Sequence, residues 1–95
     1  MFKLIITAGP DKGLAFSLDA DQIVQLGRSQ AATHRLTDPA VSRVHCEIEV
    51  IKGNRVLLTD LESRGTYVNG KRVEEALLKP GDVIRVGETE LRFEE

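Results

Sequence analysis

The chain has 95 residues, of which 41% are hydrophobic and 29% charged, and its formal net charge is −2 at pH 7. This length accommodates one domain with a modest core, and the composition is that of an ordinary folded protein. No stretch approaches the roughly 18 to 20 apolar residues of a membrane span, and the slight negative charge argues against a nucleic-acid footprint. We therefore expect a single domain over residues 1–95 that binds neither membrane nor nucleic acid.

Short strand patterns recur along the whole chain. The apolar start reaches Gly9-Pro10 too soon for the apolar region of a secretion signal, about 7 to 15 residues, and is interpreted as a first strand. In the last pattern Leu91 and Phe93 alternate with charged residues, as in a strand with one buried face. The predicted strands are Phe2 to Thr7, Leu14 to Leu18, Gln22 to Leu26, Val44 to Ile51, Arg55 to Thr59, Thr66 to Val68, Lys71 to Val73, Val83 to Val86 and Glu90 to Phe93.

Turn compositions separate these strands. Pro10-Asp11-Lys12-Gly13, Lys52-Gly53-Asn54 and Lys79-Pro80-Gly81-Asp82 combine proline, which presets φ, with glycine or asparagine, which accepts positive φ. Asn69-Gly70 is the strongest hairpin signal, because a type I′ turn needs positive φ at both central residues. Residues 74–79 could form a helix, although one too short to matter on its own. The pattern predicts an all-β fold, a sandwich of two antiparallel sheets with binding loops at one end.

The single cysteine, Cys46, cannot form an internal disulfide, which is typical of a reducing compartment such as the cytoplasm. It alternates with Val44, Ile48 and Val50, and this alternation predicts a buried core thiol. His45 is adjacent on the strand and faces the opposite way, so the two are not placed to share a metal. We expect no metal site and no cofactor.

Candidate anion ligands stand at the ends of the predicted strands. Gly27-Arg28-Ser29 follows one apolar run, Ser42-Arg43-Val44-His45 heads another, and Ser63-Arg64-Gly65-Thr66 supplies a further hydroxyl and arginine. The connection from Ser29 to Val41 is longer than about 12 residues, a length that is uncommon without a function. An arginine fork, a serine hydroxyl and backbone amides suit the three acceptor oxygens of a phosphate. A mildly acidic protein can therefore carry a positive concavity at one end.

These segments together resemble the phosphothreonine-reading loops of the forkhead-associated (FHA) domain, over nearly all 95 residues. The resemblance implies a module that binds a phosphothreonine-containing protein or peptide, in trans or from its own parent chain, in kinase-dependent signalling. It makes Arg28 and Ser42 the principal phosphate ligands and Arg43 a second basic contact, with His45 holding the loops in shape. The expected phosphopeptide-binding residues are Arg28, Ser42, Arg43, Ser63 and Arg64, and the expected loop-bracing residues are Gly27, His45, Gly65 and Thr66.

The third loop departs from the usual family pattern. FHA domains commonly read Asp-Leu, two or three variable residues, then Asn-Gly-Thr, and the asparagine holds the peptide backbone beside the phosphothreonine. Here the loop from Asp60 to Thr66 is one residue shorter, and Arg64 stands where that asparagine is expected. Arg64 either adds a phosphate contact or turns out to solvent.

The same residues bear on two other classes of function. A phosphate-independent interaction module with the same fold is the alternative, supported by Arg64 and opposed by the retained Arg28 and Ser42. An enzyme would need a nucleophile with a base, a carboxylate pair or a metal cluster, and the nearest approach is Ser42 with His45. Three residues apart on a strand, their side chains face opposite ways, so we expect no catalysis.

Overall fold

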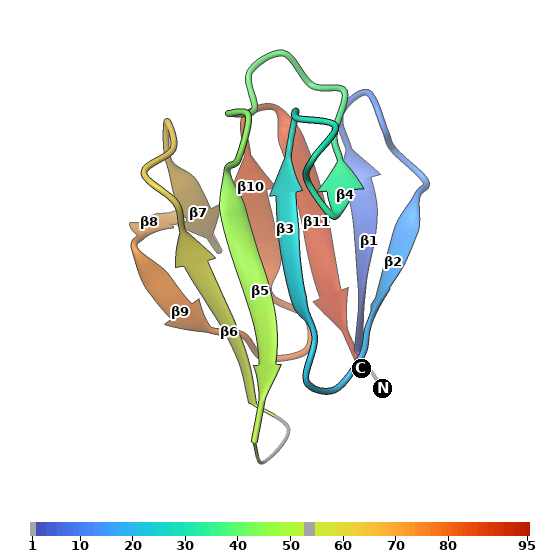
Figure 1. Cartoon of the computed structure of the whole chain (residues 1–95), viewed down its shortest axis with the longest axis vertical. Coiled ribbons are helices and arrows are strands. Elements are labelled where there is room, and N and C mark those ends of the chain that lie inside the picture. The colour runs from blue at the N-terminus through green and yellow to red at the C-terminus, as the bar shows by residue number, and fades with distance from the viewer. Residues whose placement is uncertain (1, 53–54) are drawn as a thin grey trace.

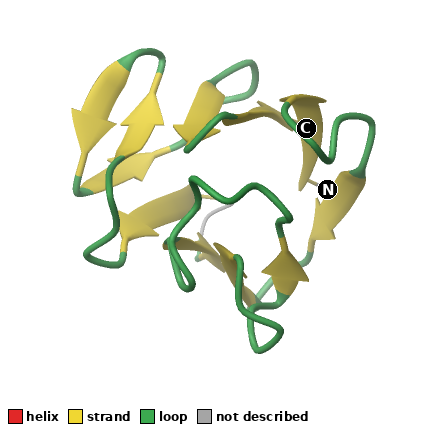
Figure 2. Ribbon diagram, turned by 90° about the horizontal axis from the view of Figure 1, so that it is seen from above, coloured by secondary structure: helices red, strands yellow, loops and turns green. Residues whose placement is uncertain are grey.

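The computed structural model describes residues 2–52 and 55–95, which form two β-sheets packed face to face (Figure 1, Figure 2). The strands are β1 (Phe2–Ala8), β2 (Ala15–Leu18), β3 (Ile23–Gly27), β4 (His34–Arg35), β5 (Cys46–Ile51), β6 (Arg55–Asp60), β7 (Thr66–Val68), β8 (Lys71–Val73), β9 (Glu75–Leu77), β10 (Val83–Val86) and β11 (Thr89–Glu94). One sheet has the order β2-β1-β11-β10-β7-β8 and the other β4-β3-β5-β6-β9. In the described part of the chain, no helix is long and apolar enough to cross a membrane.

The core lies between the two sheets and is built from alternating residues. Leu4 and Ile6 of β1 and Leu91 and Phe93 of β11 are buried, while their neighbours along each strand are more exposed. The rings of Phe2 and Phe93 stack with centroids 5.3 Å apart. Cys46 is also fully buried, as predicted. The expected sandwich is confirmed, and its sheets are antiparallel apart from the parallel pair β3 and β4.

Two local predictions were wrong. Residues 74–79 are not helical, because β9 pairs antiparallel with β6 along the edge of a sheet, and this pairing supplies backbone partners that a single helical turn would lack. The strand predicted from Val44 begins instead at Cys46, and Val44 is 37% exposed because the chain bends ahead of β5. Gly53 and Asn54 of the predicted turn at 52–54 lie outside the described residues.

The Asn69-Gly70 hairpin is confirmed. Asn69 has φ 52° and Gly70 has φ 84°, as a type I′ turn requires, and the turn joins β7 to β8. Asn69 also ties this turn to β10, since its Oδ1 accepts from the Val83 amide at 3.0 Å.

The loops that carry the candidate ligands gather at one end of the sandwich, away from the two termini (Figure 1). Two aspartates tie this end together. Asp11 accepts from both the amide and the hydroxyl of Thr37, at 2.8 and 2.7 Å. Asp38 is 1% exposed and accepts from the amide of Glu88 and the hydroxyl of Thr89 in the β10–β11 turn, at 2.8 and 2.9 Å. The long connection from β3 to β5 is therefore anchored at several points.

Candidate functional site

The end of β3 lies against the segment that precedes β5, and this contact brings Arg28 beside Ser42. The Arg28 amide donates to the Ser42 carbonyl at 3.1 Å, and the Ser29 amide donates to the Arg43 carbonyl at 3.0 Å. A Cβ atom on Gly27 would lie 2.1 Å from the Arg43 oxygen, so only glycine allows this approach. The sequence predicted Gly27 as a loop-bracing residue. In the structure Gly27 ends a strand, and close packing is its physical reason.

The Arg28 side chain is positioned by one of its donors. Its Nε–H donates to the Val41 carbonyl at 2.8 Å, and the remaining four N–H donors belong to the two terminal nitrogens. The Arg28 carbonyl in turn accepts from Nε of Arg35 at 3.0 Å. The guanidinium is therefore attached to the loop that carries Ser42, and the residue remains exposed.

His45 is fully buried and bridges two loops. Its Nδ1 accepts from the Ser42 amide at 3.0 Å, and its Nε2 contacts the Gly65 carbonyl at 2.8 Å. Because an amide can only donate and a carbonyl can only accept, the neutral ring must carry its proton on Nε2. Burial lowers the pKa of His45 below its usual value of 6.5, opposed in part by the hydrogen bond to Gly65. Both ring nitrogens are thus used within the protein.

The β6–β7 loop is built around Asp60. Its Oδ1 accepts from the hydroxyls of Ser63 and Thr66, the latter at 2.8 Å, and the Ser63 oxygen accepts from the Gly65 amide at 2.9 Å. Desolvation raises the pKa of Asp60, but the hydrogen bonds from Ser63 and Thr66 outweigh it and hold the pKa below the usual range. Gly65 has φ 132°, a conformation that favours glycine.

Arg64 is joined to the other two loops through its backbone. Its amide donates to the Ser42 Oγ at 3.3 Å, which leaves the hydroxyl proton of Ser42 free to donate to another group. Within residues 2–52 and 55–95 the one ion pair joins Arg92 to Glu94. Arg28, Arg43 and Arg64 are all exposed, and each lacks a carboxylate partner in this part of the chain.

The structure thus brings all nine predicted residues into one hydrogen-bonded frame of three loops. Gly27, Arg43, Arg64 and Gly65 join it through backbone atoms alone, and side chains take part at Arg28, Ser42, His45, Ser63 and Thr66. The Ser63 hydroxyl differs from the expectation, because it donates to Asp60 and does not face outward as a free donor.

The sequence did not predict the role of Asp38, which ties the segment ahead of Ser42 to Glu88 and Thr89. Its partners Glu88 and Thr89 lie 50 and 51 residues further along the chain, so no local sequence signal points to it. Desolvation raises the pKa of Asp38, and hydrogen bonds from Ala40, Thr89 and Glu88 bring it below the usual range. The His34 ring, in the connection from β3 to β5, stacks on Phe16 with ring centroids 4.0 Å apart.

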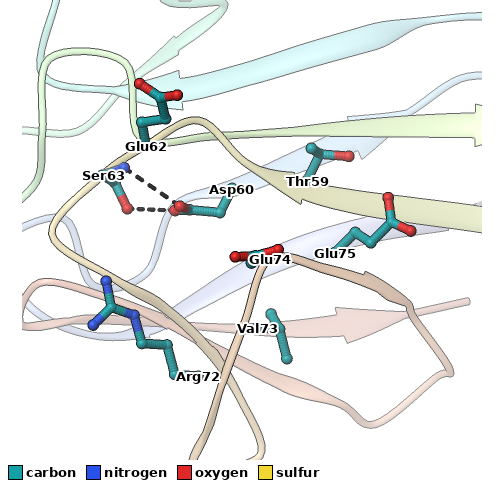
Figure 3. A pocket seen from close by; sticks show the side chains of 8 residues that line it. All are labelled: Thr59, Asp60, Glu62, Ser63, Arg72, Val73, Glu74 and Glu75. Carbon is teal, nitrogen blue, oxygen red and sulfur yellow. Dashed lines mark hydrogen bonds between the residues drawn. The ribbon is translucent and has the colours of Figure 1, made fainter.

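A pocket of about 990 Å³ opens on the far side of the β6–β7 loop, and Arg28 and Ser42 take no part in it (Figure 3). Thr59 and Asp60 of β6, Glu62 and Ser63 of the loop, and residues 72–75 line this pocket. Its position makes it a neighbour of the three-loop frame rather than the frame itself.

Comparisons with known proteins agree on one family. The FHA-domain profile matches residues 24–87. The FHA domain-containing protein FhaA of Mycobacterium tuberculosis is 49% identical over 67 residues, 70% of this chain and 12% of FhaA. Glycogen accumulation regulator GarA of Mycobacterium tuberculosis is 36% identical over 91 residues, 95% of this chain and 55% of GarA. This chain therefore spans less than two thirds of either curated relative.

A solved structure resembles the whole chain. It comes from a structural and functional analysis of phosphothreonine-dependent FHA domain interactions, and it superposes with a TM-score of 0.88 at 38% identity. The match covers 99% of this chain and 95% of that one, so it includes all three loops of the frame.

Proposed function

Because this chain belongs to the FHA-domain family, whose profile covers residues 24–87, we propose that it binds phosphothreonine-containing peptides at the three-loop frame. One observation carries the proposal. Backbone hydrogen bonds hold Arg28 beside Ser42, and the buried His45 ties Ser42 to Gly65. This frame presents a free hydroxyl proton and arginine side chains that form no ion pair with a carboxylate of the described residues, as a doubly charged phosphate requires.

Each ligand has a role that follows from its contacts. The terminal nitrogens of Arg28 bind two phosphate oxygens, and the Ser42 hydroxyl donates to one of them. Arg43 adds a second cation. The Arg64 amide donates to the Ser42 Oγ, and on this ground we assign its exposed guanidinium the role of adding charge at the phosphate. We reassign Ser63 from the ligands to the residues that support the loop, because its hydroxyl already donates a hydrogen bond to Asp60.

The domain acts as an interaction module without catalysis or cofactor. Its partner is a phosphothreonine-bearing segment, either of another protein or of its own parent chain. We infer a cytoplasmic location, where kinases make phosphothreonine and thiols stay reduced. Burial raises the pKa of the Cys46 thiol to about 12, which agrees with an unreactive core residue.

A phosphothreonine-oriented peptide library tests the proposal, together with its phosphoserine and unphosphorylated counterparts. Selective capture of phosphothreonine peptides supports it and gives the sequence preference of the flanking residues. Equal capture of unphosphorylated peptides would instead favour the phosphate-independent module, for which the replacement of asparagine by Arg64 is the one specific observation. Release of phosphate from the captured peptides would mean that the domain is an enzyme.

A further inference from the structure

The outer face of the β4-β3-β5-β6-β9 sheet presents large apolar side chains to solvent. Ile23 and Leu77 are each 52% exposed. The register pairs Ile23 with Glu49, Glu49 with Leu57, and Leu57 with Leu77. Directly paired residues point to the same face of a sheet, so these four side chains form one row across β3, β5, β6 and β9. Leu57 and Leu77 are direct neighbours in this row, and Glu49 separates them from Ile23.

The next row on the same face is acidic. Gln25 pairs with Glu47, Glu47 with Thr59, and Thr59 with Glu75. The two rows together contain three glutamates and no lysine or arginine. We call them the acidic face: Ile23, Glu49, Leu57 and Leu77 in one row, Gln25, Glu47, Thr59 and Glu75 in the other. Its charge is opposite to that of the arginine-bearing loops.

The acidic face runs directly into the pocket of about 990 Å³. Figure 3 shows Glu75 and Thr59, which belong to both, at one end of this pocket, with Glu62 and Ser63 at the other. Glu62, Glu74 and Glu75 line the pocket with Arg72 as its one cation, whereas the Asp60 carboxylate is already bound by Ser63 and Thr66. The pocket therefore favours a cationic occupant.

The same loop separates the pocket from the phosphate frame. Ser63 lines the pocket, and Arg64 beside it donates its amide to Ser42. From Asp60 to Leu57 along β6 is three residues, or about 10 Å at roughly 3.3 Å per residue. An extended peptide rises at most about 3.3 to 3.6 Å per residue, so about three of its residues span this length of β6 between the loop and the row of Leu57 and Leu77.

We propose that the acidic face and its pocket form a second docking surface for the phosphorylated partner. The occupant is a segment flanking the phosphothreonine that carries lysine or arginine next to an apolar side chain. Charge complementarity selects this segment over an acidic one, and its continuity with the three-loop frame selects the same partner chain over a separate protein. This inference rests on the proposed function, because the phosphate contact anchors the segment.

The test compares a library-selected phosphothreonine heptapeptide with versions lengthened by eight residues. One pair of versions carries a Lys/Leu extension on the N-terminal or C-terminal side, and another pair carries Glu/Leu extensions at the same places. We expect one Lys/Leu extension to tighten binding about 3-fold to 10-fold in calorimetric titrations at low salt, since several exposed charge pairs add modestly. Neither Glu/Leu extension should tighten it.

Variants of the domain test whether the acidic face and its pocket cause the gain in affinity. The double variant Glu74→Gln with Glu75→Gln should abolish the gain from the Lys/Leu extension and leave heptapeptide affinity unchanged. Leu77→Thr should reduce the gain and is a second probe should the double variant fail to fold. Glu90→Gln with Glu95→Gln is the matched control, because it also removes two carboxylates, changing the formal charge from −2 to 0, but away from the acidic face.

The outcomes separate this inference from the proposed function. Heptapeptide binding with no gain from either Lys/Leu extension overturns the second docking surface alone. A gain that survives Glu74→Gln with Glu75→Gln and Leu77→Thr, or that the control also removes, overturns it too. Failure of every phosphothreonine peptide to bind overturns both.

Discussion

Replacing His45 with alanine tests whether one buried ring holds two loops together. The change removes the acceptor of the Ser42 amide and the donor to the Gly65 carbonyl, at 3.0 and 2.8 Å. Each buried polar group left without a partner costs about 1–3 kcal/mol, and water that enters the space of the lost ring recovers part of this. We therefore expect a loss of roughly 2–4 kcal/mol, a large share of the roughly 5–15 kcal/mol that stabilises a domain.

Urea unfolding followed by circular dichroism measures the loss, since the chain has no tryptophan. Titration with a library-selected phosphothreonine peptide, under conditions in which the variant is folded, measures binding, which should weaken only through the loops. His45→Gln is the matched control, because one amide side chain can replace either hydrogen bond and should recover part of the stability. An unchanged unfolding midpoint would refute the bracing argument, and if binding were abolished as well, His45 would be a direct ligand.

Three further predictions follow from the same contacts. Gly27→Ala should destabilise the domain by about 1–3 kcal/mol in urea unfolding and weaken phosphopeptide binding, because its Cβ would lie 2.1 Å from the Arg43 oxygen; a loss below about 0.5 kcal/mol would contradict the close-packing argument. Arg64→Ala should lower affinity and flatten its salt dependence over titrations at low and high salt, and Arg64→Asn should not restore it; a silent alanine with a gain from asparagine would place Arg64 outside the site. Burial lowers the pKa values of His34 and His45 below 6.5, so below that pH the unfolded chain binds more protons than the folded one. The free energy of unfolding should therefore fall as the pH drops from about 6.5. If a His45→Gln variant kept the full pH dependence of the unfolding free energy, that dependence would belong to His34.

The regular parts of the fold could be predicted because each depends on neighbours in sequence. Alternation in the last strand gave the buried faces of Leu91 and Phe93, and Asn69-Gly70 specified its own turn through positive φ. The principal phosphate ligands could also be predicted from the sequence, because Arg28 and Ser42 stand at the ends of predicted strands and their residue types bind anions.

The remaining features depend on contacts between distant segments. Asp38 is a support only because Glu88 and Thr89 fold against it, and β9 is a strand only because β6 offers an edge. Gly27 illustrates the limit well: its residue type was predicted to matter, but the reason, the approach of the Arg43 carbonyl, exists only in three dimensions. The sequence predicts Ser63 as a ligand because nothing in it shows that the Ser63 hydroxyl donates a hydrogen bond to Asp60.

Calorimetric titration of Arg28→Ala tests the central claim most directly, with a library-selected phosphothreonine peptide and its unphosphorylated form. Arg55→Ala is the control, because Arg55 is also exposed but stands at the start of β6, and β6 begins at the end of the sandwich opposite the loops in Figure 1. The parent and Arg55→Ala should bind only the phosphorylated peptide, and the two proteins should bind it with the same affinity. Arg28→Ala should bind it about 30-fold or more weakly while remaining folded, since removing one partner of a hydrogen-bonded charge pair costs roughly 2–5 kcal/mol. Equal affinity for Arg28→Ala and the parent, or for the two forms of the peptide, would contradict the phosphate site.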